Sequence, residues 1–93
     1  MIKTFANKQT AAIFQAERVR RIDINIQRKT LMKLQQLDAA TTLDDMLVPP
    51  GNKLEALSGD RKGQHSVRVN RQWRICFKWK DGHAYDVEFC DYH

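Results

Sequence analysis

The sequence predicts an α+β domain in which helices pack against a small antiparallel sheet. In the first half of the chain, apolar residues recur at helical spacing. From Lys53 onward they alternate with polar residues at a period of two, which is typical of strands. Helices followed by strands indicate an α+β arrangement rather than an alternating α/β fold. A chain of 93 residues supplies one modest core, so residues 1–93 are expected to form a single domain.

The first half is expected to hold a short opening strand and two helices. Residues 1–5 form the strand, and residues 7–15 form a helix of one or two turns capped by Asn7. A longer helix is predicted over residues 22–40, with Asp23 placed to cap its start. Residues 40–52 connect this helix to the sheet, and their run Pro-Pro-Gly-Asn is expected to exclude regular structure. The long helix has an apolar face of Ile24, Leu31, Leu34 and Leu37 and a polar side with Arg28, Lys29 and Lys33.

The second half predicts four strands, over residues 53–57, 65–70, 73–79 and 84–90. Strict alternation assigns each side chain to the core face or to the opposite, polar face. The expected core face carries His65, Val67, Val69, Trp73, Ile75, Phe77, Trp79, Tyr85, Val87 and Phe89. The expected polar face carries Arg74, Cys76, Lys78, Asp86, Glu88 and Cys90. His65 and His83 are interpreted as structural, and the two tryptophans as core anchors.

Pairing core residues with core residues fixes an expected register. In the last hairpin it pairs Phe77 with Tyr85, Ile75 with Val87 and Trp73 with Phe89. This register needs the three-residue loop Lys80-Asp81-Gly82, with Gly82 in the left-handed conformation. It sets Arg74 opposite Glu88 and Cys76 opposite Asp86, which leaves Cys76 and Cys90 badly placed for a disulfide. In the preceding hairpin, the same rule pairs Val69 with Trp73, Val67 with Ile75 and Arg68 with Arg74.

The charge distribution indicates a polyanionic partner. The net charge is +5, and Lys and Arg are concentrated in residues 1–36 and 53–80. Nucleic acid is the first expectation, and a basic surface that only confers solubility is the alternative. The sequence has no HExxH motif, Gly-rich phosphate loop, acidic metal cage or zinc-like Cys/His spacing, so neither metal nor cofactor is expected. Without a membrane-length apolar run or signal peptide, a cytoplasmic protein without membrane association is expected.

Several side chains on the polar face are candidates for chemistry. Two arginines directly opposite each other repel, so Arg68 and Arg74 mark either an ion-pair row with Glu88 or an anion site. The predicted phosphate-binding residues are Arg68, Lys53, Lys78 and Arg61. In an extended last strand, Tyr92 lies on the face of Arg74, where a base can stack on it. His93 suits proton transfer near neutral pH, although a frayed terminal histidine is the alternative interpretation.

Cleavage of a phosphodiester without metal points to RNA, in which the adjacent 2′-hydroxyl can be the nucleophile. Such a reaction needs a base for that hydroxyl, a cation for the developing phosphorane charge and an acid for the leaving oxygen. The polar face and the end of the last strand offer residue types for all three roles.

Residues 52–93 closely resemble the HigB family of bacterial toxin–antitoxin systems, within the RelE/ParE superfamily. The shared pattern runs Lys-Leu…Leu…Gly-Asp-Arg…Gly, Ser-Val-Arg-Val-Asn, Trp-Arg-Ile-Cys-Phe, Asp-Gly and a closing Asp-Tyr-His. The resemblance implies a compact ribosome-dependent mRNA endonuclease, which cleaves mRNA in the ribosomal A site by 2′-hydroxyl attack and leaves a cyclic phosphate. It also implies a HigA-type antitoxin with a helix-turn-helix fold. The toxin is then expected to contact operator DNA only indirectly, through its complex with this antitoxin.

The resemblance also implies roles for individual residues. The key arginine of the family falls on Arg74, which is expected to stabilise transition-state charge. Tyr92 is expected to stack on or orient a base, His93 to transfer a proton, and Asp91 matches the preceding acid. Glu55 and Ser58 stand where better-studied members carry a histidine and a lysine, so Glu55 is a candidate general base.

Two other functions remain open at this point. ParE-type toxins of the same superfamily inhibit DNA gyrase without cleaving RNA. A catalytically weak or silent ribosome-binding toxin is made plausible by Glu55 and Ser58. The set of Arg74, Tyr92 and His93 favours the nuclease, because a gyrase inhibitor does not need it.

Overall fold

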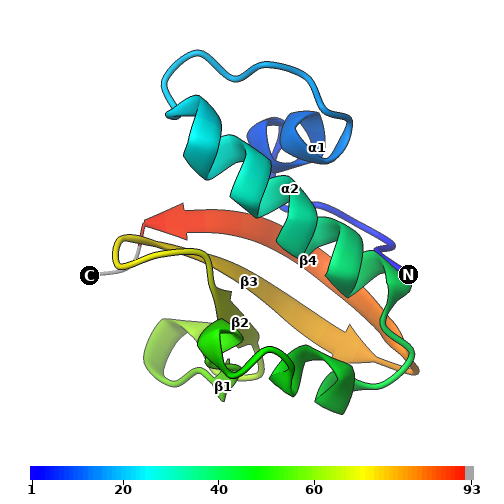
Figure 1. The fold of residues 1–93 in the computed structure, drawn as a ribbon. Coiled ribbons are helices and arrows are strands. Elements are labelled where there is room, and N and C mark those ends of the chain that lie inside the picture. Colours follow the sequence, from blue (N-terminus) through cyan, green and yellow to red (C-terminus); the bar gives the residue numbers. More distant parts are fainter. Residues whose placement is uncertain (92–93) are drawn as a thin grey trace.

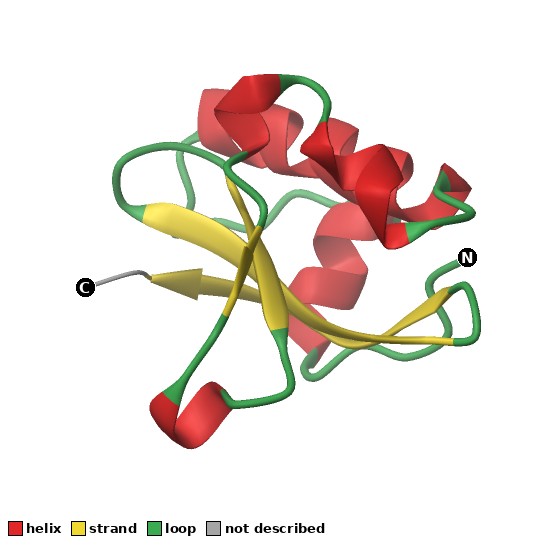
Figure 2. Ribbon diagram, turned by 90° about the horizontal axis from the view of Figure 1, so that it is seen from below, coloured by secondary structure: helices red, strands yellow, loops and turns green. Residues whose placement is uncertain are grey.

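The protein folds as two helices packed on one face of a four-stranded antiparallel sheet. This computed structural model describes residues 1–91. The strands follow each other in the order β1-β2-β3-β4 (Figure 1). In Figure 2, which looks from below, the strands lie in front of the two longer helices. The predicted fold class is therefore confirmed. The elements are α1 (Lys8–Phe14), α2 (Ile24–Ala39), β1 (Glu55–Ala56), β2 (His65–Arg68), β3 (Trp73–Lys80) and β4 (His83–Asp91).

Both helices begin at the predicted capping residues. The side-chain oxygen of Asn7 accepts a hydrogen bond from the backbone N–H of Thr10 at 2.9 Å. Asp23 accepts from the backbone N–H of Asn25 at 2.8 Å, so each cap satisfies a donor that the helix itself leaves unpaired. The predicted apolar face of α2 is correct except at its first residue. Ile24 is the first residue of the helix and is 38% exposed.

The N-terminal segment does not form a separate strand but lies along β4. Ile2 and Phe5 form isolated parallel bridges with Ala84 and Val87. The first residues of the chain lie beside β4 in Figure 1. The predicted opening strand therefore exists only as these two bridges, and it covers the outer edge of the sheet.

The connector between α2 and β1 is more regular than predicted. It contains two short 3₁₀ helices, Leu43–Leu47 and Pro50–Asn52. Proline fits the first position of a helical turn, so Pro50 begins the second one, contrary to the expectation that this run excludes regular structure. Asn52 is fully buried, and its side-chain amide donates to the backbone oxygens of Met46 and Val48. The segment between β1 and β2 likewise holds a 3₁₀ helix, Gly59–Arg61.

The hairpin of β2 and β3 has the predicted register. Val67 pairs with Ile75, and Arg68 lies directly opposite Arg74. The backbone N–H of Val69 donates to the oxygen of Trp73 at 2.9 Å, which extends the same register to the turn. The predicted strand at residues 53–57 is shorter than expected, since β1 comprises only Glu55–Ala56.

The predicted register of β3 and β4 is wrong, by one residue next to the turn and by two residues further along the strands. Ile75 pairs with Phe89, and Arg74 pairs with Cys90 instead of Glu88. At the turn, Lys80 pairs with His83, so the loop has two residues, not three. Both loop residues, Asp81 and Gly82, have positive φ angles of 53° and 80°, which is the geometry of a type I′ turn. The predicted left-handed conformation of Gly82 is confirmed.

A β-bulge reconciles the short turn with the buried positions further along β4. Phe77 lies opposite both Asp86 and Val87, and Asp86 has a φ of 51°. Because of the extra residue in β4, the side chains before the bulge point to the opposite faces from those that strict alternation predicts. Ala84 is fully buried on the core face, and Tyr85 pairs with Lys78 on the opposite face, contrary to its predicted place in the core. Cys76 consequently lies opposite Glu88 rather than Asp86.

The core lies between the helices and one face of the sheet. Trp73 stacks on Phe89 with 4.4 Å between ring centroids, which supports its interpretation as a packing anchor. The fully buried apolar side chains include Ile13, Leu34, Leu37, Met46, Val67, Ile75, Phe77 and Val87. Among residues 1–91, no helix is long and apolar enough to cross a membrane.

Candidate active site

Arg74 lies at the centre of the polar sheet face and is held there by protein groups. It is only 5% exposed. Its Nε donates to Ser66 Oγ at 2.7 Å, and its Nη2 donates to the backbone oxygen of Lys53 at 2.8 Å. A guanidinium has its donors in a rigid planar fork, so two bonds to separate segments fix the position of the whole group. Arg74 is therefore a preorganised cation in the middle of the sheet.

Glu55 is brought next to this arginine by the pairing of β1 with β2. Glu55 lies opposite Ser66 in the sheet, on the rung beside Arg74. Its Oε1 lies 3.6 Å from Arg74 Nη2, while the carboxylate side chain remains 46% exposed. The structure thus places the predicted base beside the predicted charge-stabilising group. A solvent-accessible carboxylate beside a fixed cation is a suitable arrangement for proton transfer next to a phosphate.

Lys53 contributes to this site through its backbone. It adopts a left-handed conformation with a φ of 44°, which places its carbonyl oxygen within reach of Arg74. The prediction that Lys53 binds phosphate concerned its side chain, and the described contact gives it a second role as an anchor. Ser66 was missed in the sequence. The sequence offers one indication of its role: Ser66 pairs with Glu55 on one side and with Cys76 on the other, which places it on the polar face.

Arg61 and Asp91 border a neighbouring cavity of about 300 Å³. Arg61 donates to Glu88 at 3.1 Å, and this hydrogen bond raises the pKa of the guanidinium. Asp91 accepts from the side-chain amide of Gln72 at 3.2 Å. The cavity is also lined by Cys90, the cross-strand partner of Arg74. The structure therefore gathers Arg61 and Asp91 around one cavity together with Cys90.

Two free thiols, Cys76 and Cys90, lie side by side in this cavity. The hydrogen bond between them lowers the pKa of Cys76 and raises the pKa of Cys90. From the sequence, these residues were considered as zinc ligands and as a disulfide pair, and neither role was expected. Among residues 1–91, no group of three or more His, Cys, Asp or Glu side chains is arranged to hold a metal ion.

Of the other two predicted phosphate-binding residues, Lys78 lies apart from this centre and Arg68 lies beside it. Lys78 forms an ion pair with Asp86 at 3.2 Å near the far end of the hairpin. Arg68 is the cross-strand neighbour of Arg74, but its Nε donates to the backbone oxygen of Asn70 at 3.1 Å. Tyr92 and His93 lie outside the described residues, so their predicted roles remain predictions.

Comparison with known proteins identifies the family. A family model for the RelE-like toxin of the type II toxin–antitoxin system HigB matches residues 3–93. The chain belongs to the HigB-like toxin family. It is thus a toxin of a type II toxin–antitoxin system, a class that acts together with an antitoxin, and the predicted family is confirmed.

Two relatives from bacteria are similar over much or all of their length. Endoribonuclease HigB of Proteus vulgaris is 33% identical over 93 residues, and the match covers 100% of both chains. Toxin HigB-1 of Vibrio cholerae serotype O1 is 46% identical over 68 residues, which cover 73% of this chain and 72% of that protein.

Solved structures of other toxins share the fold. A chain of the YoeB–YefM complex from Staphylococcus aureus gives a TM-score of 0.63 at 19% identity, covering 100% of this chain and 98% of that one. YafQ from Escherichia coli gives a TM-score of 0.57 at 17% identity, with coverages of 98% and 93%. At this level of identity the likeness concerns the fold alone.

Proposed function

We propose that this toxin is a ribosome-dependent mRNA endonuclease of the cytoplasm that inhibits translation by cutting mRNA in the ribosomal A site. The observation that carries the proposal is the buried and anchored Arg74, with the half-exposed Glu55 carboxylate 3.6 Å from it. The full-length similarity to a protein named endoribonuclease HigB supports the same reaction class.

In this mechanism the 2′-hydroxyl of the RNA is the nucleophile. Glu55 accepts its proton, the hydroxyl oxygen attacks the adjacent phosphorus, and the bond to the 5′ oxygen of the next nucleotide breaks. The products are a 2′,3′-cyclic phosphate and a 5′-hydroxyl end, so no metal-bound water is required. Arg74 stabilises the negative charge that grows on the phosphorane oxygens.

The end of β4 supplies the remaining roles. His93 protonates the leaving oxygen, Tyr92 stacks on or orients a base, and Asp91 helps to position the two residues that follow it. The hydrogen bond from Gln72 supports this role, because it ties the Asp91 carboxylate to the β2–β3 loop. Arg61 and Arg68 provide flanking phosphate contacts, with Lys78 and the Lys53 side chain further out.

The proposed antitoxin is a HigA-type protein with a helix-turn-helix domain, through which the toxin meets operator DNA. The toxin carries a net charge of +5, so an acidic antitoxin surface and ribosomal RNA compete for overlapping basic regions. Membership of a type II toxin–antitoxin family supports the existence of this partner.

Mapping of mRNA 5′ ends on translating ribosomes tests the nuclease. The wild-type toxin is expected to produce new ends in the A site, whereas Arg74→Lys and Glu55→Gln reduce them at least tenfold. Arg74→Lys keeps the positive charge but not the planar fork, and thermal unfolding of each variant checks that it is folded. Ribosome binding without new A-site ends would contradict the proposal and indicate a silent binder. DNA breaks linked to gyrase would instead support a ParE-like inhibitor.

Truncation tests the end of the strand separately. Removal of Tyr92 and His93 is expected to abolish toxicity while antitoxin binding and thermal unfolding stay close to those of the full chain. Retained toxicity would show that these two residues take no part in the reaction.

A further inference from the structure

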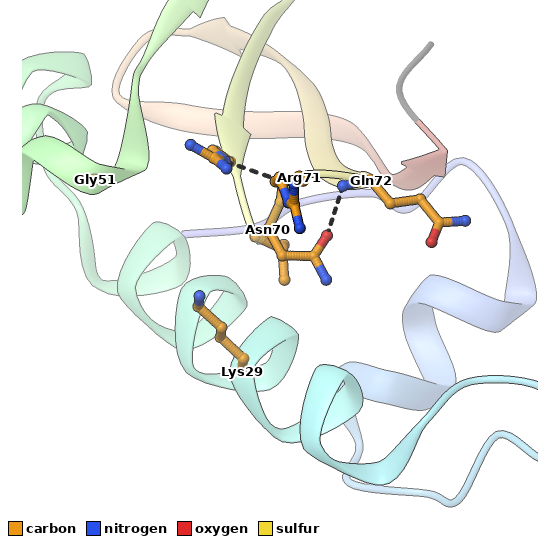
Figure 3. Close-up of a pocket in the computed structure, with 7 residues that line it drawn as sticks. Lys29, Gly51, Asn70, Arg71 and Gln72 are labelled. Carbon is orange, nitrogen blue, oxygen red and sulfur yellow. Dashed lines mark hydrogen bonds between the residues drawn. The ribbon is translucent and has the colours of Figure 1, made fainter.

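A second cavity lies between α2 and the loop that joins β2 to β3. Its volume is about 530 Å³. Figure 3 shows Lys29 reaching from α2 toward the loop, with Gly51 of the connector at the far side. Three segments that are distant in the sequence therefore enclose one space. Its lining includes Lys29, Gly51, Arg68, Asn70, Arg71 and Gln72.

The charges in this cavity all have the same sign. Lys29, Arg68 and Arg71 line it, and its lining includes no acidic residue. Cations that converge on one space repel each other, and an anion between them relieves that repulsion. Three donors of this type, two of them guanidinium groups, suit the oxygens of a phosphate group.

The loop that carries these groups is already ordered. Asn70 Oδ1 accepts from the backbone N–H groups of Gln72 and Trp73, each at 2.8 Å. The bond from Arg68 Nε to the Asn70 backbone oxygen, at 3.1 Å, holds the guanidinium of Arg68 against the same loop. Because the loop and Arg68 are fixed before any ligand arrives, little conformational freedom is lost on binding.

The cavity is joined to the candidate active site by two connections. Gln72 lines the cavity and donates from its side chain to Asp91 at 3.2 Å. Arg68 lines the cavity and lies directly opposite Arg74 in the sheet. An extended polyanion can therefore occupy the cavity and the active site at the same time, whereas a compact anion would occupy only one of them.

We infer that this cavity binds backbone phosphates of RNA in the ribosome–mRNA complex and thereby holds the toxin in register with the strand it cuts. The inference rests on the proposed function for the identity of the polyanion. Acidic protein, such as an antitoxin, is the other macromolecule with matching charge. RNA is favoured by the two guanidinium groups and by the continuity with the Arg74 site.

Gly51 allows a test that leaves every cation in place. A Cβ atom added at Gly51 meets nothing within 4 Å, and the residue does not have a positive φ angle. Gly51→Asp therefore introduces a negative charge at the wall of the cavity, and Gly51→Asn introduces the same shape without charge. Affinity for programmed 70S ribosomes is expected to be about tenfold lower for the Asp variant than for the Asn variant at 0.1 M salt, since one charge opposes roughly one phosphate contact.

The salt dependence of ribosome binding measures the number of phosphate contacts that the toxin makes. Removal of one Lys–phosphate contact is expected to reduce the slope of log affinity against log salt by about one, so Lys29→Ala with Arg71→Ala reduces it by about two. Lys8→Ala with Arg20→Ala removes the same charge from exposed positions outside the cavity and serves as the control. The same measurement with a short single-stranded RNA separates binding to RNA from binding to ribosomal proteins.

The binding readout is independent of cleavage, so the two proposals fail separately. A wild-type toxin that cuts nothing, with a Gly51→Asp variant that binds ribosomes weakly, would refute the nuclease and support the RNA contact. Equal affinities of Gly51→Asp and Gly51→Asn for ribosomes would overturn the inference. Loss of antitoxin binding with unchanged ribosome affinity would also overturn it, because the cavity would then contact protein.

Discussion

Ser66→Ala tests whether the structure holds Arg74 in place through one buried hydroxyl. Ser66 is fully buried, and its Oγ accepts from Arg74 Nε at 2.7 Å. A hydrogen bond to a charged group contributes about 1.5–3 kcal/mol to stability, and alanine leaves the guanidinium donor without this acceptor. The free energy of unfolding is therefore expected to fall by about 1.5–3 kcal/mol, which lowers Tm by roughly 10 °C for a domain of this size.

Urea unfolding of the purified toxin measures the loss, and the cleavage assay measures its functional consequence. Cleavage is expected to fall at least tenfold under conditions in which the variant is fully folded, because Arg74 keeps its bond to Lys53 but loses its second anchor. Ser58→Ala is the matched control. Ser58 is exposed and makes no capping hydrogen bond, so its replacement is expected to change stability by less than about 0.5 kcal/mol.

A double-mutant cycle decides whether the hydroxyl acts through the arginine. Ser66→Ala and Arg74→Met are each measured alone and then together. Residues in direct contact are expected to be coupled by about 0.5–3 kcal/mol. Additive effects, or a cost of Ser66→Ala below about 0.5 kcal/mol, would refute the reasoning that Ser66 orients Arg74.

Three further predictions concern the fold. Gly82→Ala is expected to lower the free energy of unfolding by about 1 kcal/mol or more, because Gly82 has a φ of 80° and a Cβ there lies 3.4 Å from the Thr41 oxygen; thermal unfolding measures this. Asp23→Ala removes the α2 cap and is expected to cost about 1 kcal/mol by urea unfolding. Hydrogen bonds from the backbone N–H groups of Thr41 and Thr42 lower the pKa of Asp45, so its contribution is present above the unfolded pKa of about 3.9 and is lost as pH falls through the lower folded pKa. Asp45→Asn is expected to weaken the dependence of the free energy of unfolding on pH below about pH 4. An unchanged dependence in this acidic range would contradict the prediction.

The helices and the β2–β3 hairpin could be predicted because local signals determined them. Asn7 and Asp23 each begin a helix by accepting backbone hydrogen bonds, which is a property of a few consecutive residues. The pairing of Val67 with Ile75 follows from alternation alone, since no residue interrupts the ladder between these strands.

The β3–β4 register could not be predicted from alternation, because alternation in the sequence does not reveal a bulge. Tyr85, Val87 and Phe89 form an unbroken apolar series, although the strand switches faces at Asp86. The Asp81-Gly82 pair was the available signal, because this dipeptide favours a two-residue type I′ turn. A two-residue turn places Ala84, not Tyr85, in the core, and only a bulge then returns Val87 and Phe89 to it.

The candidate site could be predicted only where the strand pairing is regular. Arg74 and Glu55 meet because the β1–β2–β3 pairing is regular. The anchors of Arg74 were not predicted, since Ser66 looks like an ordinary strand residue and the Lys53 carbonyl is positioned by a left-handed backbone conformation. Pairing of Arg74 with Cys90 depends on the bulge and was likewise inaccessible to pattern reasoning.

The bridges of Ile2 and Phe5 to β4 have a consequence for synthesis of the toxin. β4 is made after the other described elements, yet the first residues of the chain and β3 both pair with it. Contacts between residues so far apart in sequence form slowly, because a long loop must close first. A nascent chain therefore keeps its sheet incomplete until β4 emerges. The toxin therefore has neither a complete sheet nor Cys90 beside Arg74 until almost all of the described chain has been made.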